Sequence, residues 1–173
     1  DLGRVATVTS ARGMFHSPDS APERLVFSDW GPKTVEGIPF YPVDPQDGRI
    51  RNVVMLHSPR GVTPPTMPRT VELPCRTAAN AIHFLSGVSG WGFPNTKPGT
   101  VSMIVRLRYA DGATEDHELT NGVHFADYLG DANVEGSKLA HSFGQQQIRY
   151  FKIAPKREDL IEAVELVKGP DET

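Results

Sequence analysis

The stretch TVSMIVRLRYADGATEDHEL, residues 100–119, decides the fold class. Its first half alternates with a period of two, as a strand does when one face lies on a core and the other faces solvent. The side expected to face the core carries Met103, Val105, Leu107 and Tyr109, and the other side carries Ser102, Arg106 and Arg108, with Ile104 as an exception. Asp111-Gly112 in the middle is a strong signal for a tight hairpin turn. The stretch therefore predicts two antiparallel strands joined by that turn.

Short strand-like stretches continue on both sides of this hairpin. Residues 25–27, 38–43, 51–56, 70–73, 80–85 and 147–153 are predicted strands, and residues 4–8 and 123–128 are weaker ones. Residues 160–167 form the last predicted strand, with a short helix as the alternative. The chain holds 16 Gly and 15 Pro residues, which favour turns, and no stretch longer than about ten residues has a helical apolar period. We therefore expect an all-β fold, a two-sheet antiparallel β-sandwich of jelly-roll type with little or no helix.

The chain length of 173 residues fits a single sandwich domain. Residues 1–22 are polar and irregular and are expected to form a lead-in arm. The sequence begins without Met and without an apolar leader, so we expect a fragment of a larger protein.

Composition excludes several classes of partner. The formal net charge is −3 and no basic stripe is present, so nucleic acid is not an expected partner. No apolar run approaches the ~18 residues that span a bilayer, so membrane insertion is not expected. Cys75 is the one cysteine, which rules out an intrachain disulfide. We expect Cys75 to be a small buried apolar residue rather than a nucleophile.

Enzyme motifs are lacking in this sequence. Residues 87–91 begin like a nucleophile elbow, but Trp91 stands where the final glycine is required. The six histidines form no metal-binding pair. We therefore expect no catalytic residues and no cofactor, with a structural calcium ion as the exception. Asp131, Asn133 and Glu135 offer hard oxygen ligands at alternate positions and are the candidate metal ligands.

The aromatic loop at residues 89–95, SGWGFPN, is the best candidate for a binding site. A large aromatic ring flanked by glycines can stack on the apolar face of a sugar, while neighbouring polar groups bond its hydroxyls. The alternative is that Trp91 and Phe93 plug the end of the sandwich and close its core. The candidate ligand-binding residues are Trp91, Phe93, Asn95, His83 and Tyr128. His83 has a plainer alternative as a hydrogen-bonded strand histidine.

Several stretches together resemble a known kind of bacterial module. They are IPFYPVDP (38–45), RNVVML (51–56), PRTVELPCRTAANAIHFLSGVSGWG (68–92) and VSMIVRLRYADGATEDHELTNGVHFADY (101–128). The succession resembles the galactose-binding-like, carbohydrate-binding-module-type jelly rolls of secreted glycoside hydrolases. More narrowly, it resembles a domain of large multifunctional secreted proteins of planctomycete-type bacteria. The resemblance implies a non-catalytic, secreted or periplasmic accessory domain that binds polysaccharide or oligosaccharide beside neighbouring domains of a parent chain.

Three hypotheses follow for the function. The leading one is carbohydrate binding without catalysis, with Trp91 as the stacking platform. The second is a structural or protein-interaction module without sugar affinity, which predicts a buried Trp91. The third is a cryptic glycoside hydrolase, which needs two carboxylates converging in one cleft with one pKa raised.

Overall fold

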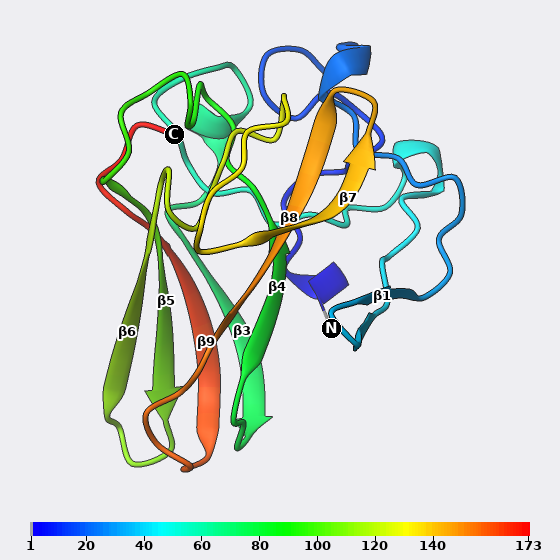
Figure 1. The fold of residues 1–173 in the computed structure, drawn as a ribbon. Helices are drawn as coiled ribbons and strands as arrows, with labels where there is room; N and C mark the ends of the chain where they lie inside the picture. The colour runs from blue at the N-terminus through cyan, green and yellow to red at the C-terminus, as the bar shows by residue number, and fades with distance from the viewer. Residues whose placement is uncertain (1) are drawn as a thin grey trace.

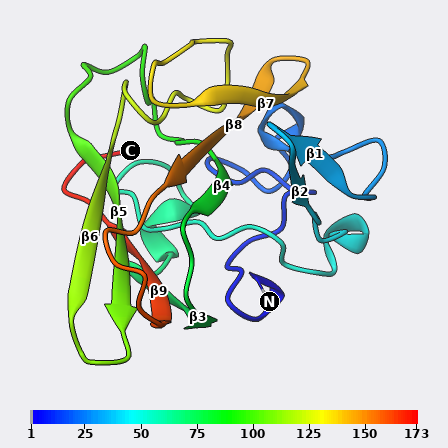
Figure 2. The ribbon, with the colours of Figure 1, turned by 60° about the horizontal axis from the view of Figure 1, so that its bottom comes forward.

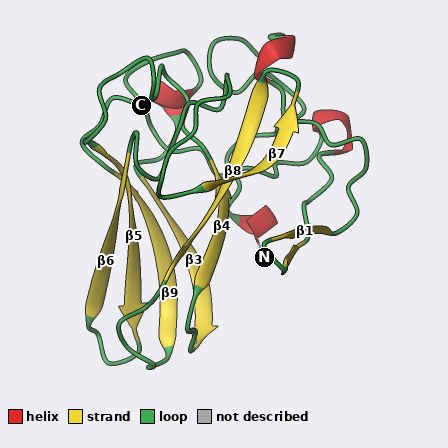
Figure 3. Cartoon of the chain, in the orientation of Figure 1, coloured by secondary structure: helices red, strands yellow, loops and turns green. Residues whose placement is uncertain are grey.

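The computed structural model describes residues 2–173 and has an all-β sandwich architecture. The strands, drawn in yellow in Figure 3, are β1 (Lys33–Val35), β2 (Ile38–Phe40), β3 (Thr70–Thr77), β4 (Ile82–Ser86), β5 (Val101–Tyr109), β6 (Thr114–Thr120), β7 (Lys138–Phe143), β8 (Gln146–Ile153) and β9 (Ile161–Lys168). Within the described residues the only helical elements are short 3-10 turns, η1 (Leu2–Arg4), η2 (Ala21–Glu23), η3 (Gln46–Gly48) and η4 (Pro64–Thr66). No helix in residues 2–173 has the length and apolarity needed to cross a membrane.

Two antiparallel sheets make up the sandwich (Figures 1 and 2). One has four strands in the order β3-β9-β5-β6, and the other has three in the order β4-β8-β7. The short β1–β2 hairpin forms a separate two-stranded sheet. The ladders between the strands of residues 2–173 are antiparallel, which confirms the predicted all-β sandwich class.

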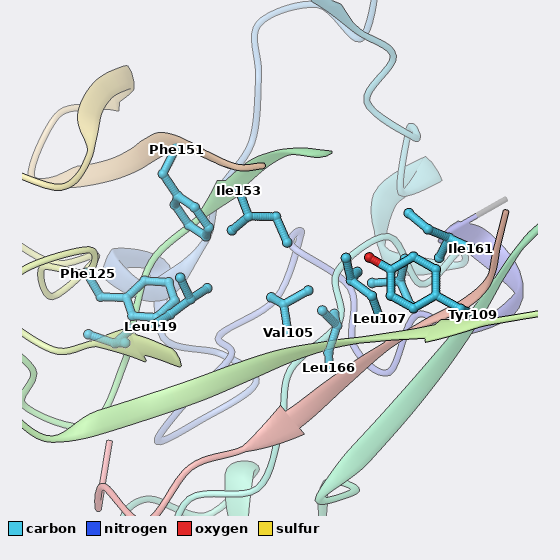
Figure 4. Close-up of a cluster of buried hydrophobic side chains, with 11 residues drawn as sticks. Val105, Leu107, Tyr109, Leu119, Phe125, Phe151, Ile153, Ile161 and Leu166 are labelled. Atoms are coloured by element: carbon cyan, nitrogen blue, oxygen red, sulfur yellow. The ribbon is translucent and has the colours of Figure 1, made fainter. Parts of the chain in front are cut away.

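The hydrophobic core lies between the two sheets, where side chains of both inner faces meet (Figure 4). Val105 and Leu107 of β5 are fully buried, and Leu166 of β9 lies beside them. Phe151 and Ile153 of β8 come from the opposite sheet. Burial of apolar surface at about 25 cal/mol per Å² is the main force that holds the sheets together.

The β5–β6 hairpin forms as its sequence predicts. Its two strands pair from Val101↔Thr120 to Arg108↔Thr114, and the inward face carries Val105, Leu107 and Tyr109. At the turn, the Gly112 N–H donates to the Tyr109 carbonyl over 2.9 Å. Gly112 has a φ of +86°, a conformation that glycine adopts without steric cost.

Four further predicted strands are confirmed. Residues 70–73 lie in β3, residues 80–85 overlap β4, residues 147–153 lie in β8, and residues 160–167 correspond to β9. The last of these is a strand and not the alternative short helix. Residues 38–43 form a strand only over β2.

Other predicted strands are wrong. Residues 25–27 are irregular, and residues 51–56 carry only an isolated bridge between Val53 and Val8. Residues 4–8 and 123–128 likewise contain isolated bridges or turns and no strand. Conversely, β7 is a strand that was not predicted, because its polar stretch has no regular alternation of apolar and polar residues. These errors share a cause, because an apolar extended segment becomes a strand only where a partner edge is within hydrogen-bonding reach.

Candidate functional site

A cleft of about 860 Å³ lies where the loop around Trp91 meets the β7–β8 end of the three-stranded sheet. Its walls come from four segments that are distant in sequence, residues 15–22, 90–95, 127–133 and 139–149. The volume falls within the range of small-molecule and cofactor sites. Three of the five candidate ligand-binding residues line this cleft, namely Trp91, Asn95 and Tyr128.

The loop that carries Trp91 is fixed on both sides of the ring. The Gly92 N–H donates to Asp127 Oδ2 over 2.7 Å, and the Asp127 N–H donates to the Phe93 carbonyl over 2.9 Å. On the other side, Arg60 Nη1 donates to the Gly90 carbonyl over 3.0 Å. Gly92 is required for this close approach, because a Cβ there would lie 2.3 Å from Val88 Cγ2.

Trp91 projects from this anchored loop and is 57% exposed. The alternative in which Trp91 plugs the core is therefore wrong. Its backbone φ is +65°, a left-handed conformation that costs a bulky L-residue roughly 1–2 kcal/mol. A strained and exposed indole on a fixed loop is a feature that packing does not explain, and such outliers cluster at binding sites.

Asp127 is the buried carboxylate that holds the loop. Besides the bond from Gly92, its Oδ1 accepts from the Leu129 N–H over 2.9 Å. Burial raises the pKa of Asp127, while the backbone hydrogen bonds act in the opposite direction. Both oxygens are thus already engaged by backbone amides.

Tyr128 lines the same cleft, and its hydroxyl oxygen is buried and has no hydrogen-bond partner among the described residues. The residue is only 5% exposed. Burial raises the pKa of Tyr128, so the hydroxyl stays protonated. A buried polar group without a partner is costly.

Arg149 forms part of the cleft wall, although nothing in the sequence analysis identifies it. It is 2% exposed, and its Nε donates to Ser137 Oγ over 2.7 Å while Nη2 donates to Asn133 Oδ1 over 2.7 Å. Burial lowers the pKa of Arg149. Its position in the strand could have indicated its burial, because Arg149 lies on the same inward face of β8 as Phe151 and Ile153.

The metal candidates do not assemble into an oxygen cage. Asn133 Oδ1 accepts from the Arg149 guanidinium, which places a positive charge where a calcium ion would need to sit. Asp131 lines the cleft, whereas Glu135 does not. Across residues 2–173 there is no group of three or more His, Cys, Asp or Glu side chains suited to a metal ion.

The two remaining candidates lie outside the cleft. Phe93 is half-buried, and its N–H donates to Asn121 Oδ1 over 2.9 Å. His83 lines a different cavity, and its Nδ1 lies 2.9 Å from Tyr150 Oη with the two rings stacked. His83 therefore has the hydrogen bond that its plainer alternative requires.

The chain matches no known protein family, curated protein or solved structure. The chemistry of the cleft is accordingly the basis for a functional conclusion. That chemistry is an exposed indole, an unpartnered buried hydroxyl and a set of polar side chains. The polar side chains exposed along the cleft are His16, Asn95, Asp131, Asn133, Ser142 and Gln145.

Proposed function

We propose that this domain binds carbohydrate without catalysis, in the cleft beside Trp91. The observation that carries the proposal is the 57% exposed Trp91, held by an anchored loop at a cleft with polar walls. A flat indole offers a stacking surface for the apolar face of a sugar ring. Asn95 and Gln145 supply amide donors and acceptors, and Asp131 supplies acceptors, for the sugar hydroxyls.

We further propose a jelly-roll, galactose-binding-like accessory domain of a secreted or periplasmic multidomain protein. This part of the proposal is supported by the sequence resemblance and by the all-β architecture.

The test is a glycan-array screen followed by calorimetric titration of the glycans that bind. Trp91→Ala is expected to weaken binding at least tenfold, which corresponds to about 1.4 kcal/mol. The matched control is Tyr41→Ala, because Tyr41 is 75% exposed and lies outside this cleft. Absence of glycan binding, or equal affinity in Trp91→Ala and the unchanged protein, would contradict the proposal.

Two carboxylates of the cleft bear on the hydrolase hypothesis. Asp127 and Asp131 both line it, and burial raises the pKa of Asp127. We assign Asp127 to loop anchoring because both its oxygens accept backbone N–H groups. Release of reducing sugar from a bound glycan, lost in Asp131→Asn, would instead favour a hydrolase.

A protein-interaction module is the other alternative. Leu129 and Leu139 are exposed and line the cleft with Trp91, so the surface is partly apolar. This alternative predicts a buried Trp91, whereas the Trp91 ring is exposed. Protein capture that is lost in Leu139→Asp, without any glycan affinity, would favour it over carbohydrate binding.

A further inference from the structure

A second cavity, of about 590 Å³, lies between the two sheets. It is lined mainly by apolar side chains, among them Val54, Leu56, Leu73, Ile82 and Phe84. These side chains are only half-buried, although they pack against the core. The inner faces of the sandwich are thus incompletely covered on this side.

Residues 52–57, which we name the acceptor segment, line this cavity. The Val53 N–H donates to the Val8 carbonyl, Met55 exchanges hydrogen bonds with Thr7 Oγ1, and the His57 N–H donates to the Pro68 carbonyl. Within residues 2–173, the N–H and C=O groups of Val54 and Leu56, which lie between these paired residues, have no hydrogen-bond partner.

The cavity is bordered by further sheet edges. β3 is an end strand of the four-stranded sheet and β4 is an end strand of the three-stranded sheet. They are consecutive, with only residues 78–81 between them, and both contribute lining residues. An edge strand presents a row of unpaired N–H and C=O groups that can accept another strand.

We propose that the cavity is a docking site for an extended peptide strand with apolar residues at alternate positions, which pairs with the acceptor segment. The strand would place its apolar side chains against Leu73 and Phe84 and its backbone against Val54 and Leu56. A small apolar molecule would fill the same space but leave those peptide groups unpaired. A peptide strand pairs those groups and fills the apolar space as well, which favours the peptide.

The probe is the peptide acetyl-Lys-Val-Thr-Val-Thr-Val-Lys-amide, added at up to millimolar concentration to the 173-residue chain. Binding is expected to slow amide hydrogen exchange at Val54 and Leu56, as followed by NMR. It is also expected to slow alkylation of Cys75, which lines the cavity and is the one thiol in the chain. Cys75→Ser, which removes the thiol, is the control for the alkylation measurement.

Two N-methylated versions of the peptide make the test specific to strand pairing. One is methylated at the valine amides and the other at the threonine amides, so each loses the donors of one strand edge. At least one of them is expected to bind about tenfold more weakly than the parent peptide. Equal binding of all three peptides would overturn the proposal in favour of a simple apolar pocket. Absence of peptide binding would overturn it as well, and so would protection of Val54 and Leu56 by self-association of the chain without peptide.

Discussion

Three residues that line the cleft depart from ordinary packing. Trp91 is a bulky residue with a positive φ and an exposed ring. Tyr128 buries a hydroxyl without a partner in the described chain, and Arg149 buries a guanidinium that hydrogen-bonds to neutral oxygens. Such departures cost stability, and proteins retain them mainly at functional sites.

The strain at Trp91 can be measured by replacing it with glycine. Trp91→Gly removes the left-handed strain of roughly 1–2 kcal/mol but adds backbone freedom to the unfolded chain, at roughly 0.5–1 kcal/mol. We expect the free energy of unfolding to stay unchanged or rise by up to about 1.5 kcal/mol, while glycan affinity is lost. Urea denaturation gives the free energy of unfolding. A fall of more than about 1 kcal/mol would mean that the ring supports the fold.

Tyr109 and Glu115 form a buried pair whose energy depends on pH. The Tyr109 hydroxyl donates to Glu115 Oε2 over 2.7 Å, and burial together with that bond raises the pKa of Tyr109 to about 12. The pKa of tyrosine in the unfolded chain is about 10, so the folded state holds the proton more tightly. The resulting stabilisation is complete below pH ~10 and is lost as the pH rises towards about 12.

Substitution of Tyr109 by Phe tests this linkage. Tyr109→Phe is expected to lower the free energy of unfolding at neutral pH by about 1–3 kcal/mol, because Glu115 loses a donor. It should also flatten the decline of that free energy between pH ~10 and ~12. Urea denaturation at a series of pH values measures both effects. If the free energy of unfolding falls equally steeply at alkaline pH in Tyr109→Phe and in the unchanged protein, Tyr109 is not the group responsible for the fall.

The β5–β6 hairpin is the element whose sequence describes it most completely. Period-two alternation sets its inward face, and Asp111-Gly112 sets its turn. One detail differs, since Ser102 is buried rather than exposed. The register shifts between Val101 and Met103, and Ser102 Oγ lies 3.2 Å from Thr173 Oγ1. The C-terminal residues therefore cover the first residues of β5.

The turn predicts a graded response to substitution at Gly112. Gly112→Ala is expected to lower the free energy of unfolding by about 1 kcal/mol, because its φ of +86° is strained for alanine. Gly112→Asn should lower it less, because asparagine tolerates the left-handed region. Thermal denaturation of the two variants measures the difference. Equal loss in both would mean that side-chain contacts, and not backbone strain, set the cost.

At the scale of the whole molecule, stability depends on one core shared by both sheets. Val105, Leu107 and Tyr109 of one sheet and Phe151 and Ile153 of the other belong to the same buried cluster. Because neither sheet can bury its inner face alone, we expect both sheets to unfold together in a single transition.

A truncation in this core tests that expectation. Leu107→Ala removes a fully buried side chain and is expected to lower the free energy of unfolding by about 2–5 kcal/mol, in one transition. Leu139→Ala is the control, because Leu139 is 57% exposed, and its effect should stay within about 0.5 kcal/mol. Urea denaturation followed by circular dichroism and by fluorescence measures both variants. Separate transitions for the two probes would show that the sheets unfold independently.

Local sequence patterns predict the all-β class, the hairpin and the strands at 70–73, 80–85, 147–153 and 160–167 correctly. Their signal is local, because side-chain alternation and turn residues act over a few positions. Which apolar segments become strands depends on tertiary contacts, since residues 51–56 pair only through an isolated bridge between Val53 and Val8, whereas β3 pairs with β9 along its length. The tertiary structure also decided that Trp91 is exposed, that Asn95 and Tyr128 share its cleft, and that Arg149 engages Asn133. Those outcomes depend on contacts between residues that are far apart in the chain, which local patterns do not encode.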